Sequence, residues 1–260
     1  MSDSVGLLRD QVAIVTGASQ GIGRAIAERF AQAGAAVTVN YFQSADAAHA
    51  VVTAIQERGG RAIAVQADVR DPGAVQKMVA QTQDAFGRID ILVNNALHNY
   101  RFDPANNPRF EEMSWSQFQD QIDGTVAGAM NTIQACLPAL RAAGGGAVVN
   151  ILTNLITNPV VQYHAYTTAK AAMIGMSRNL AAELGPDNIR VNMVAGGLIM
   201  TTQASAPTSE VVQDIVRSGT PLRRLGTTED IADAILALAS PLSRFVTGQF
   251  IAVDGGLTMP

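Results

Sequence analysis

The chain has 260 residues, of which 48% are hydrophobic and 15% are charged, and its formal net charge is −4. This composition excludes an intrinsically disordered chain, and the single cysteine, Cys136, excludes a disulfide scaffold. The mild acidity argues against nucleic acid as a partner, and no apolar run reaches the roughly 18 residues of a membrane span. Because no signal peptide is recognisable, we expect a globular protein of a reducing compartment, the cytoplasm.

Apolar, β-branched runs alternate with Ala-rich helical segments along the whole chain. The predicted strands are 12–16, 36–41, 62–66, 89–94, 147–152, 189–195 and 249–254, and the predicted helices are 22–33, 45–58, 73–86, 114–142, 163–184 and 228–240. This alternation predicts βαβ units in a parallel sheet, and the nearly continuous apolar strands indicate a sheet covered on both faces. We therefore expect one doubly wound α/β domain over residues 1–260, with candidate substrate loops at about 97–113 and 196–218.

A glycine-rich turn follows the first predicted strand and precedes a helix. The segment TGASQGIG, residues 16–23, contains Gly17, Gly21 and Gly23. Such glycines allow a tight turn, close approach of a pyrophosphate and close packing of the helix on the strand, while the helix N-terminus favours an anion. The alternative is a glycine-rich turn without a ligand, which the flanking strand and helix make less favourable.

Several motifs, taken in order, resemble the classical short-chain dehydrogenase/reductase family from about residue 8 to 258. They are the turn at 16–23, Asp68-Val69, Asn94-Asn95-Ala96, Tyr166-x-x-x-Lys170 and VDGG at 253–256. The resemblance implies a single Rossmann-type domain with a seven-stranded parallel sheet. It also implies hydride transfer between a nicotinamide cofactor and a carbonyl or secondary alcohol, and a homotetramer.

The resemblance assigns catalytic roles to two residues of one predicted helix. Tyr166 is implied to be the general acid toward a carbonyl, and Lys170 to bind the ribose and lower the Tyr166 pKa. Residues four apart share a helix face, and a neighbouring ammonium favours a phenolate. The alternative is an unrelated tyrosine and lysine on a helix surface.

Four positions depart from the family pattern. Thr153 stands where a serine is usual, and its hydroxyl can still donate to a carbonyl, although an ordinary strand end is the alternative. Thr125 stands where an asparagine kinks the helix and holds a relay water, so we expect a rearranged water chain through Lys170. Leu97 and Gly196 replace a glycine and a proline, and we expect a changed loop path and a looser lid.

The resemblance places the cofactor against residues from several parts of the chain. They are Gly17, Ser19, Gln20, Gly21, Ile22, Gly23, Asn40, Ser44, Asp68, Val69, Asn95, Ala96, Tyr166, Lys170, Gly197, Ile199 and Thr201. No carboxylate stands near Tyr41, where NAD-preferring members often carry one, and no Arg or Lys stands at Gln20 or near Phe42. Because nothing repels a 2′-phosphate, we expect NADP, with NAD as the alternative.

The overall pattern looks most like the 3-oxoacyl-(acyl-carrier-protein) reductase group, which implies a small-molecule or acyl-thioester carbonyl substrate. Surface arginines, namely Arg101, Arg109, Arg217, Arg223 and Arg224, are candidates to face an acidic carrier protein. Small residues in 114–142 and the segment 246–256 are candidate subunit interfaces, with intramolecular packing as the alternative. His49, His98 and His164 lack metal-ligand spacing, so we assign no metal.

A rival interpretation is a cofactor-binding homologue with weak or no catalysis, acting as a structural or regulatory partner. Thr125 and Leu97 motivate it, whereas the retained Thr153, Tyr166 and Lys170 speak against it. Another Rossmann enzyme, such as a methyltransferase, is disfavoured because it would not need the Tyr166-x-x-x-Lys170 pair.

Overall fold

The structure is a computed structural model that describes residues 6–97, 107–200, 202 and 205–259. Within these residues a sheet of seven parallel strands has the order β3-β2-β1-β4-β5-β6-β9. The strands are β1 (Val12–Val15), β2 (Ala36–Tyr41), β3 (Arg61–Gln66), β4 (Ile91–Asn94), β5 (Gly146–Thr153), β6 (Ile189–Gly196) and β9 (Phe250–Val253). The predicted Rossmann-type fold is confirmed, and each predicted strand differs from the observed one by at most two residues at either end.

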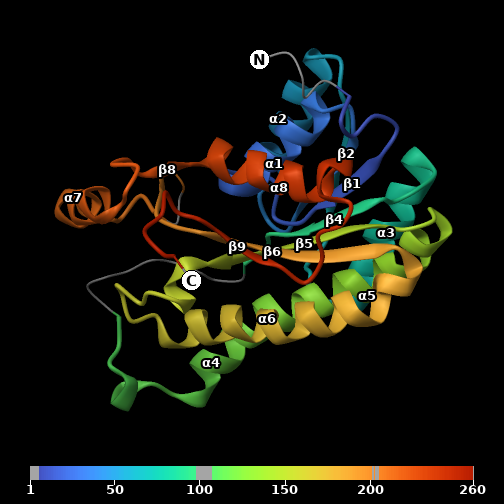
Figure 1. Cartoon of the computed structure of the whole chain (residues 1–260). Coiled ribbons are helices and arrows are strands. Elements are labelled where there is room, and N and C mark those ends of the chain that lie inside the picture. Colours follow the sequence, from blue (N-terminus) through green and yellow to red (C-terminus); the bar gives the residue numbers. More distant parts are fainter. Residues whose placement is uncertain (1–5, 98–106, 201, 203–204, 260) are drawn as a thin grey trace.

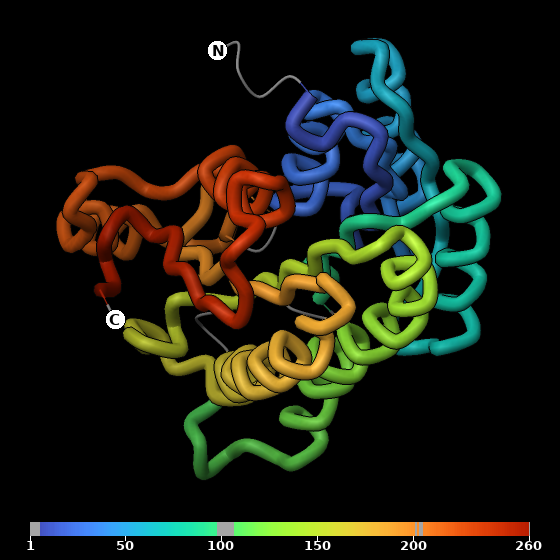
Figure 2. The backbone as a smooth tube through the Cα atoms, turned by 45° about the vertical axis from the view of Figure 1, so that its right-hand side comes forward, coloured from blue at the N-terminus to red at the C-terminus, as the bar shows by residue number. Residues whose placement is uncertain are grey.

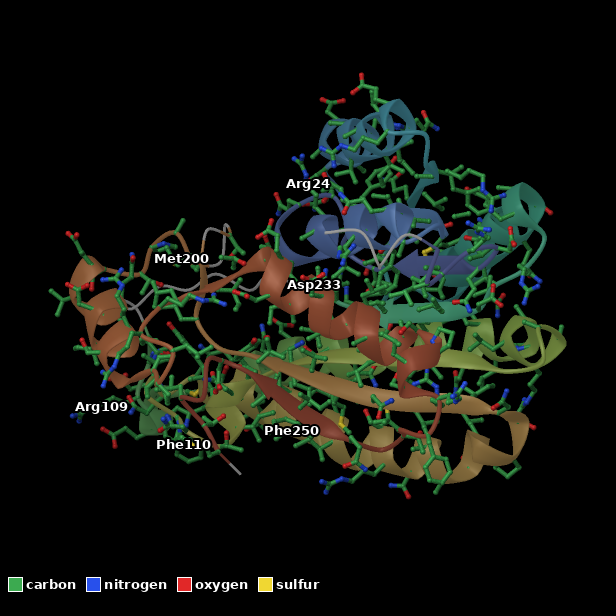
Figure 3. The ribbon with its side chains drawn as sticks, turned by 45° about the horizontal axis from the view of Figure 1, so that its top comes forward. Arg24, Arg109, Phe110, Met200, Asp233 and Phe250 are labelled. Carbon is green, nitrogen blue, oxygen red and sulfur yellow. The ribbon has the colours of Figure 1, made fainter. Side chains whose placement is uncertain are left out.

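Helices cover both faces of the sheet (Figure 1). One face carries α1 (Gly21–Gln32), α2 (Ala45–Glu57) and α8 (Thr228–Ala239), and the other carries α3 (Pro72–Phe86), α5 (Gly128–Ala142) and α6 (His164–Leu184). Each layer has its own buried apolar cluster, with Phe30 at the centre of the first and Met78 in the second. Figure 3 shows Asp233 of α8 on the side shared with α1, where it pairs with Arg29.

The long helix predicted over 114–142 is interrupted. It begins as predicted at Ser114, whose backbone N–H donates to Gln117 Oε1 at 2.7 Å. The first part, α4 (Trp115–Ile122), runs into a π-helical turn at Asp123–Ala127, and α5 follows. A π turn inserts an extra residue into the helical repeat and is common at functional sites. Periodicity alone does not reveal it, because apolar residues continue on both sides.

The candidate substrate loop over 196–218 contains regular structure. It holds the short strand β7 (Ile199–Met200), which pairs with β8 (Gly226–Thr227), and the helix α7 (Glu210–Gly219). Ser209 caps α7, because its Oγ accepts from Val212 N at 3.4 Å. In Figure 1 this helix projects beyond the carboxyl ends of the strands.

The strand order reverses at β1, which has β2 on one side and β4 on the other. In open α/β sheets, ligands bind in the crevice outside the carboxyl ends of the strands at such a point. The C-terminal tail also reaches this end, beside α7 and the segment that follows β5 (Figures 1 and 2). Among the described helices, none has the length and apolar character needed to cross a membrane.

Candidate active site

The turn between β1 and α1 can be formed only by glycine at two positions. Gly17 has a φ of +60°, and a Cβ there would lie 3.0 Å from the Cα of Ala96. A Cβ on Gly23 would lie 2.4 Å from the carbonyl oxygen of Gly17. The turn therefore packs closely on Ala96 and on its own backbone. The first N–H groups of α1 point out of the helix end, where an anion is stabilised.

Polar side chains of neighbouring strands hold this turn in place. Asn95 Nδ2 donates to the carbonyl oxygens of Thr16 at 2.8 Å and Gly17 at 3.0 Å, and Thr16 Oγ1 accepts from the backbone of Asn95 and Ala96. Asn40 is buried, its Oδ1 accepts from Gly17 N at 3.1 Å, and its Nδ2 donates to the carbonyl oxygen of Ala67. Asn40, predicted as a cofactor ligand, thus acts on the backbone of the turn.

A groove of about 350 Å³ runs along the turn and the ends of β2, β3 and β4. Twelve of the predicted cofactor residues line it, namely Gly17, Ser19, Gln20, Gly21, Ile22, Gly23, Asn40, Ser44, Asp68, Val69, Asn95 and Ala96. Tyr41, Phe42, Ala67 and Thr202 also line the groove and were not among the predicted cofactor residues. Tyr41 ends the predicted second strand and Phe42 follows it, and this position was the available signal.

A cation lies at the outer end of this groove. The Arg70 guanidinium is 6.0 Å from the centre of the Phe42 ring and pairs with Asp68, with Nη2 2.6 Å from Oδ2. Sequence inspection found no Arg or Lys beside Phe42, because Arg70 reaches it from the end of another strand. The Arg70 guanidinium near Phe42 is therefore paired with a carboxylate that itself lines the groove.

The predicted catalytic residues converge where β5 and α6 approach each other. Lys170 is only 3% exposed and its Nζ donates to the carbonyl oxygen of Ile151 at 2.5 Å. Nζ also lies 6.0 Å from the centre of the Tyr166 ring. Burial lowers the pKa of Lys170 to about 7, since desolvation penalises the ammonium. Thr153 is buried at the end of β5, where its Oγ1 accepts from Leu155 N at 3.3 Å.

A second pocket, of about 200 Å³, contains these three groups and adjoins the groove through shared lining residues. Among its described lining residues, Lys170 is the one with a charged side chain. The rest of the wall is largely apolar and comes from the segment before α6, from β6 and β7, from α7 and from the C-terminal tail. It includes Leu155, Val160, Val161, Leu198, Ile199, Val212, Val216, Ile231 and Leu257.

Known proteins are similar in sequence to almost the whole chain. The family model described as enoyl-(acyl carrier protein) reductase matches residues 17–258. The 7α-hydroxysteroid dehydrogenase of Escherichia coli (strain K12) is 35% identical over 249 residues, covering 96% of this chain and 94% of that protein. The 3-oxoacyl-(acyl-carrier-protein) reductase FabG of Staphylococcus aureus (strain Mu50) is 36% identical over 249 residues, covering 95% and 98%. The chain belongs to the classical short-chain dehydrogenase/reductase family.

A solved structure of this family matches almost the entire chain. It is a 7α-hydroxysteroid dehydrogenase complexed with NADH and 7-oxo glycochenodeoxycholic acid, with a TM-score of 0.90, 35% identity and 98% of both chains covered. The predicted reaction type is confirmed: this short-chain dehydrogenase/reductase is a nicotinamide-dependent oxidoreductase that acts on a CH–OH group or carbonyl.

Thr125 lies in the π turn and shares a small cavity with the active site. Its side chain is 5% exposed, and its Oγ1 has no hydrogen-bond partner among the residues that the structure describes. The cavity, about 10 Å³, is also lined by Lys170, Asn94 and Thr16. Such a space is close to the volume needed for one water molecule.

The other departures have different outcomes. Leu97 lines both pockets at the point where they meet. Gly196 is buried within β6, where it pairs with Thr153 and Val253 in a regular strand. Gly197 and Ile199, which were predicted to contact the cofactor, line the second pocket, while Thr201 and His98 lie outside the described residues.

The arginines proposed to face a carrier protein are engaged by their own chain where they are described. Arg217 pairs with Asp214, Arg224 with Asp230 and Arg109 with Glu111, while Arg223 donates to the carbonyl oxygen of Ser218. Arg101 lies outside the described residues. Within the described part of the chain, no group of three or more His, Cys, Asp or Glu residues is arranged to hold a metal ion.

Proposed function

We propose that this chain is an NADP(H)-dependent reductase of a carbonyl flanked by apolar groups, working also in the direction of alcohol oxidation. The observation that carries the proposal is the convergence of Tyr166, Lys170 and Thr153 in an apolar pocket continuous with the glycine-turn groove. The rival interpretation, a homologue without catalysis, does not need that convergence.

The groove fits a dinucleotide. Gly17 and Gly23 let the turn pack closely on Ala96, Asn95 and its own backbone, and the groove that runs along this turn at the N-terminus of α1 suits a pyrophosphate. Asp68, Val69 and Ala96 would line the adenosine side, and Lys170 would reach the nicotinamide ribose. When bound, the nicotinamide ring supplies or accepts the hydride.

The protein's own part is the proton and the orientation of the carbonyl. Tyr166 O–H donates its proton to the carbonyl oxygen during reduction, and the Thr153 hydroxyl donates a hydrogen bond to the same oxygen. The protonated Lys170 favours the Tyr166 phenolate that remains. Because Lys170 is buried and its pKa is lowered to about 7, its protonation changes near neutral pH.

Thr125 acts on Lys170 as a positioning residue. One water in the shared cavity would accept from Lys170 Nζ and bond Thr125 Oγ1, which leaves that hydroxyl satisfied. The family asparagine is thus replaced by a hydroxyl that supports the same proton path.

NADP is favoured over NAD for electrostatic reasons. The groove beside Tyr41 and Ser44 contains no carboxylate on the strand end, and Arg70 lies near Phe42. No carboxylate at the end of β2 would repel a 2′-phosphate, and Arg70 lies nearby as the partner of Asp68.

The substrate is first proposed to be a 3-oxoacyl thioester, as the name of the Staphylococcus relative suggests. A second candidate, a free apolar ketone, is favoured by the arginine pairs, because engaged arginines offer less to an acidic carrier. Both candidates place an apolar group against Val212 and Val216.

A homotetramer is part of the proposal. Two groups of exposed apolar residues support it, one with Phe110 before α4 and Trp115 at its start, and one with Leu242 and Phe245 before β9. Among the small residues of 114–142, Gly128 is buried inside the chain, where a Cβ would lie 2.8 Å from Val69 Cγ2. The cytoplasmic location stays a prediction.

The test is NADPH oxidation, followed at the nicotinamide absorbance, with 3-oxoacyl thioesters of a carrier protein and of N-acetylcysteamine, and with 2-decalone. Turnover of the first two supports the thioester, and turnover of 2-decalone alone supports the free ketone. Binding of NADPH without turnover of any carbonyl would establish the rival interpretation.

A further inference from the structure

The carboxylate of Asp254, which follows β9, gathers four hydrogen bonds. Its Oδ1 accepts from Gly256 N at 3.1 Å, and its Oδ2 accepts from Thr258 N at 3.0 Å and Thr258 Oγ1 at 2.6 Å. Asn154 Nδ2 also donates to Oδ2, at 3.1 Å, across 100 residues of sequence. Asn154 directly follows Thr153, so one side chain links the C-terminal tail to the segment that carries a predicted catalytic hydroxyl.

The tail, residues Gly255–Met259, is packed against the end of α7. A Cβ on Gly255, which has a φ of +67°, would lie 2.5 Å from Thr220 Cγ2, and Leu222 N donates to the Gly255 carbonyl oxygen at 3.2 Å. In Figures 1 and 2 the tail lies beside the segment that follows β5. This path brings Leu257 to the wall of the substrate pocket.

Two walls of the pocket therefore depend on one contact network. Leu257 lies close to Gly219, since a Cβ built there would be 3.5 Å from Leu257 Cδ1, and it lines the pocket together with Val212 and Val216 of α7. Loss of the bonds from Asp254 to Thr258 would let the tail and Leu257 move. Loss of the bond from Asn154 to Asp254 would let the segment after Thr153 move.

We propose that the tail is a specificity-determining wall of the substrate pocket, in which Leu257 limits the size of the apolar group beside the carbonyl. Asp254 is a positioning residue that couples this wall to the Thr153 segment. The inference rests on the proposed function, because it assumes that the pocket holds the carbonyl substrate. One methylene in an apolar pocket changes discrimination by roughly 10- to 200-fold, so removal of a leucine side chain has a measurable effect.

The first experiment compares Leu257→Ala with Met259→Ala, whose side chain is exposed two residues away in the same tail. The kcat/KM ratio of 2-decalone to 2-butanone is expected to rise about tenfold in Leu257→Ala and to stay within twofold in Met259→Ala. Equal kcat/KM ratios in both variants and in wild type would overturn the proposal that Leu257 limits the size of the substrate.

The second experiment tests the coupling. Thr258→Val removes the Oγ1 bond to Asp254 without changing a lining residue, and it is expected to shift the same ratio by about two- to fivefold through KM. Asp254→Ala is expected to lower kcat as well, and Asp254→Asn, which keeps an acceptor oxygen, to restore most of it. The contrary result is a lower Tm in Thr258→Val and Asp254→Ala while the kcat/KM ratio of the two ketones and kcat stay at the wild-type values. That result would show that the Asp254 carboxylate has a purely structural role. If Asp254→Ala does not fold, Thr258→Val decides.

A failure of the proposed function would look different. If wild type reduces neither ketone, the shift in Tm that saturating 2-decalone produces in the NADP⁺-bound protein still reports on the wall. Leu257→Ala is then expected to enlarge that shift in Tm. An unchanged shift would contradict the proposed role of Leu257 in the pocket wall, independently of turnover.

Discussion

The cofactor groove and the substrate pocket share an edge but are built in different ways. The groove consists of backbone and short polar side chains at strand ends, held by bonds such as that from Asn95 to Gly17. The pocket wall consists of apolar side chains from connecting segments and from α7. A ligand common to a family can be held by backbone, whereas the substrate is selected by side chains that are easily exchanged.

The largest expected effect separates chemistry from cofactor binding. Tyr166→Phe removes the proton donor, so kcat should fall by about 10²–10⁴-fold while the NADPH Kd changes only a few-fold. Single-turnover kinetics and fluorescence titration measure the two quantities. Unchanged turnover would refute the assignment of Tyr166.

The shape of the groove should change when the close packing of its turn is disturbed. Gly23→Ala puts a Cβ 2.4 Å from a carbonyl oxygen, so we expect at least about tenfold weaker NADPH binding and a lower Tm. Gly175→Ala is the matched control, because it lies in open space in α6 and should stabilise by about 0.5–1 kcal/mol. Equal behaviour of the two variants would contradict the role of the turn.

Cofactor choice should change with one charge. Wild type is expected to have the lower KM for NADPH, and Tyr41→Asp to reverse the order, because a like charge costs several kcal/mol against a 2′-phosphate. The control is Tyr41→Asn, whose side chain has the shape of aspartate without the charge. In this variant NADPH should remain the preferred cofactor. A wild-type preference for NADH would refute the electrostatic argument.

The buried lysine predicts a pH-dependent stability. The Lys170 pKa is about 7 in the folded protein against 10.5 for the ordinary side chain, so the unfolded chain binds more protons between these values. Stability therefore rises with pH in this window, by about 2 kcal/mol between pH 7 and 9. Urea unfolding of wild type and Lys170→Met at both pH values isolates this contribution, which the variant should lack. An equal pH dependence in both proteins would contradict it.

The smallest effect concerns Thr125. Thr125→Val removes a hydroxyl without a protein partner among the described residues, so Tm should stay or rise while kcat falls a few-fold if a water is held there. Thr125→Asn should preserve or raise kcat. A drop of both kcat and Tm in Thr125→Asn would show that the surroundings have adapted to threonine.

The fold and the groove were predictable because both depend on local patterns. Strand-length apolar runs, the glycines at 16–23 and the spacing from Tyr166 to Lys170 are visible in a few residues each. The helix α7 was missed because the segment 196–218 was interpreted as a substrate loop. The four-residue spacing of Val212 and Val216, which is typical of one helix face, was not used. The π turn was missed because an inserted helical residue leaves no signature in composition.

The substrate pocket was not predictable for a different reason. Leu257, Val212 and Val160 meet only after the chain has folded, and each alone is an ordinary apolar residue. The same holds for Arg70 and Phe42, which approach from the ends of neighbouring strands. Sequence motifs therefore describe the shared chemistry of the family better than the features that select a substrate.

The most direct test of the central claim is isotope transfer. NADPH carrying deuterium at the transferable C4 position is incubated with the enzyme and the best carbonyl substrate, and the alcohol is analysed by mass spectrometry and NMR. The account predicts one deuterium on the carbinol carbon with wild type, and none with Tyr166→Phe on the same timescale. Alcohol formed without deuterium at that carbon, or no alcohol from any carbonyl tested, would contradict it.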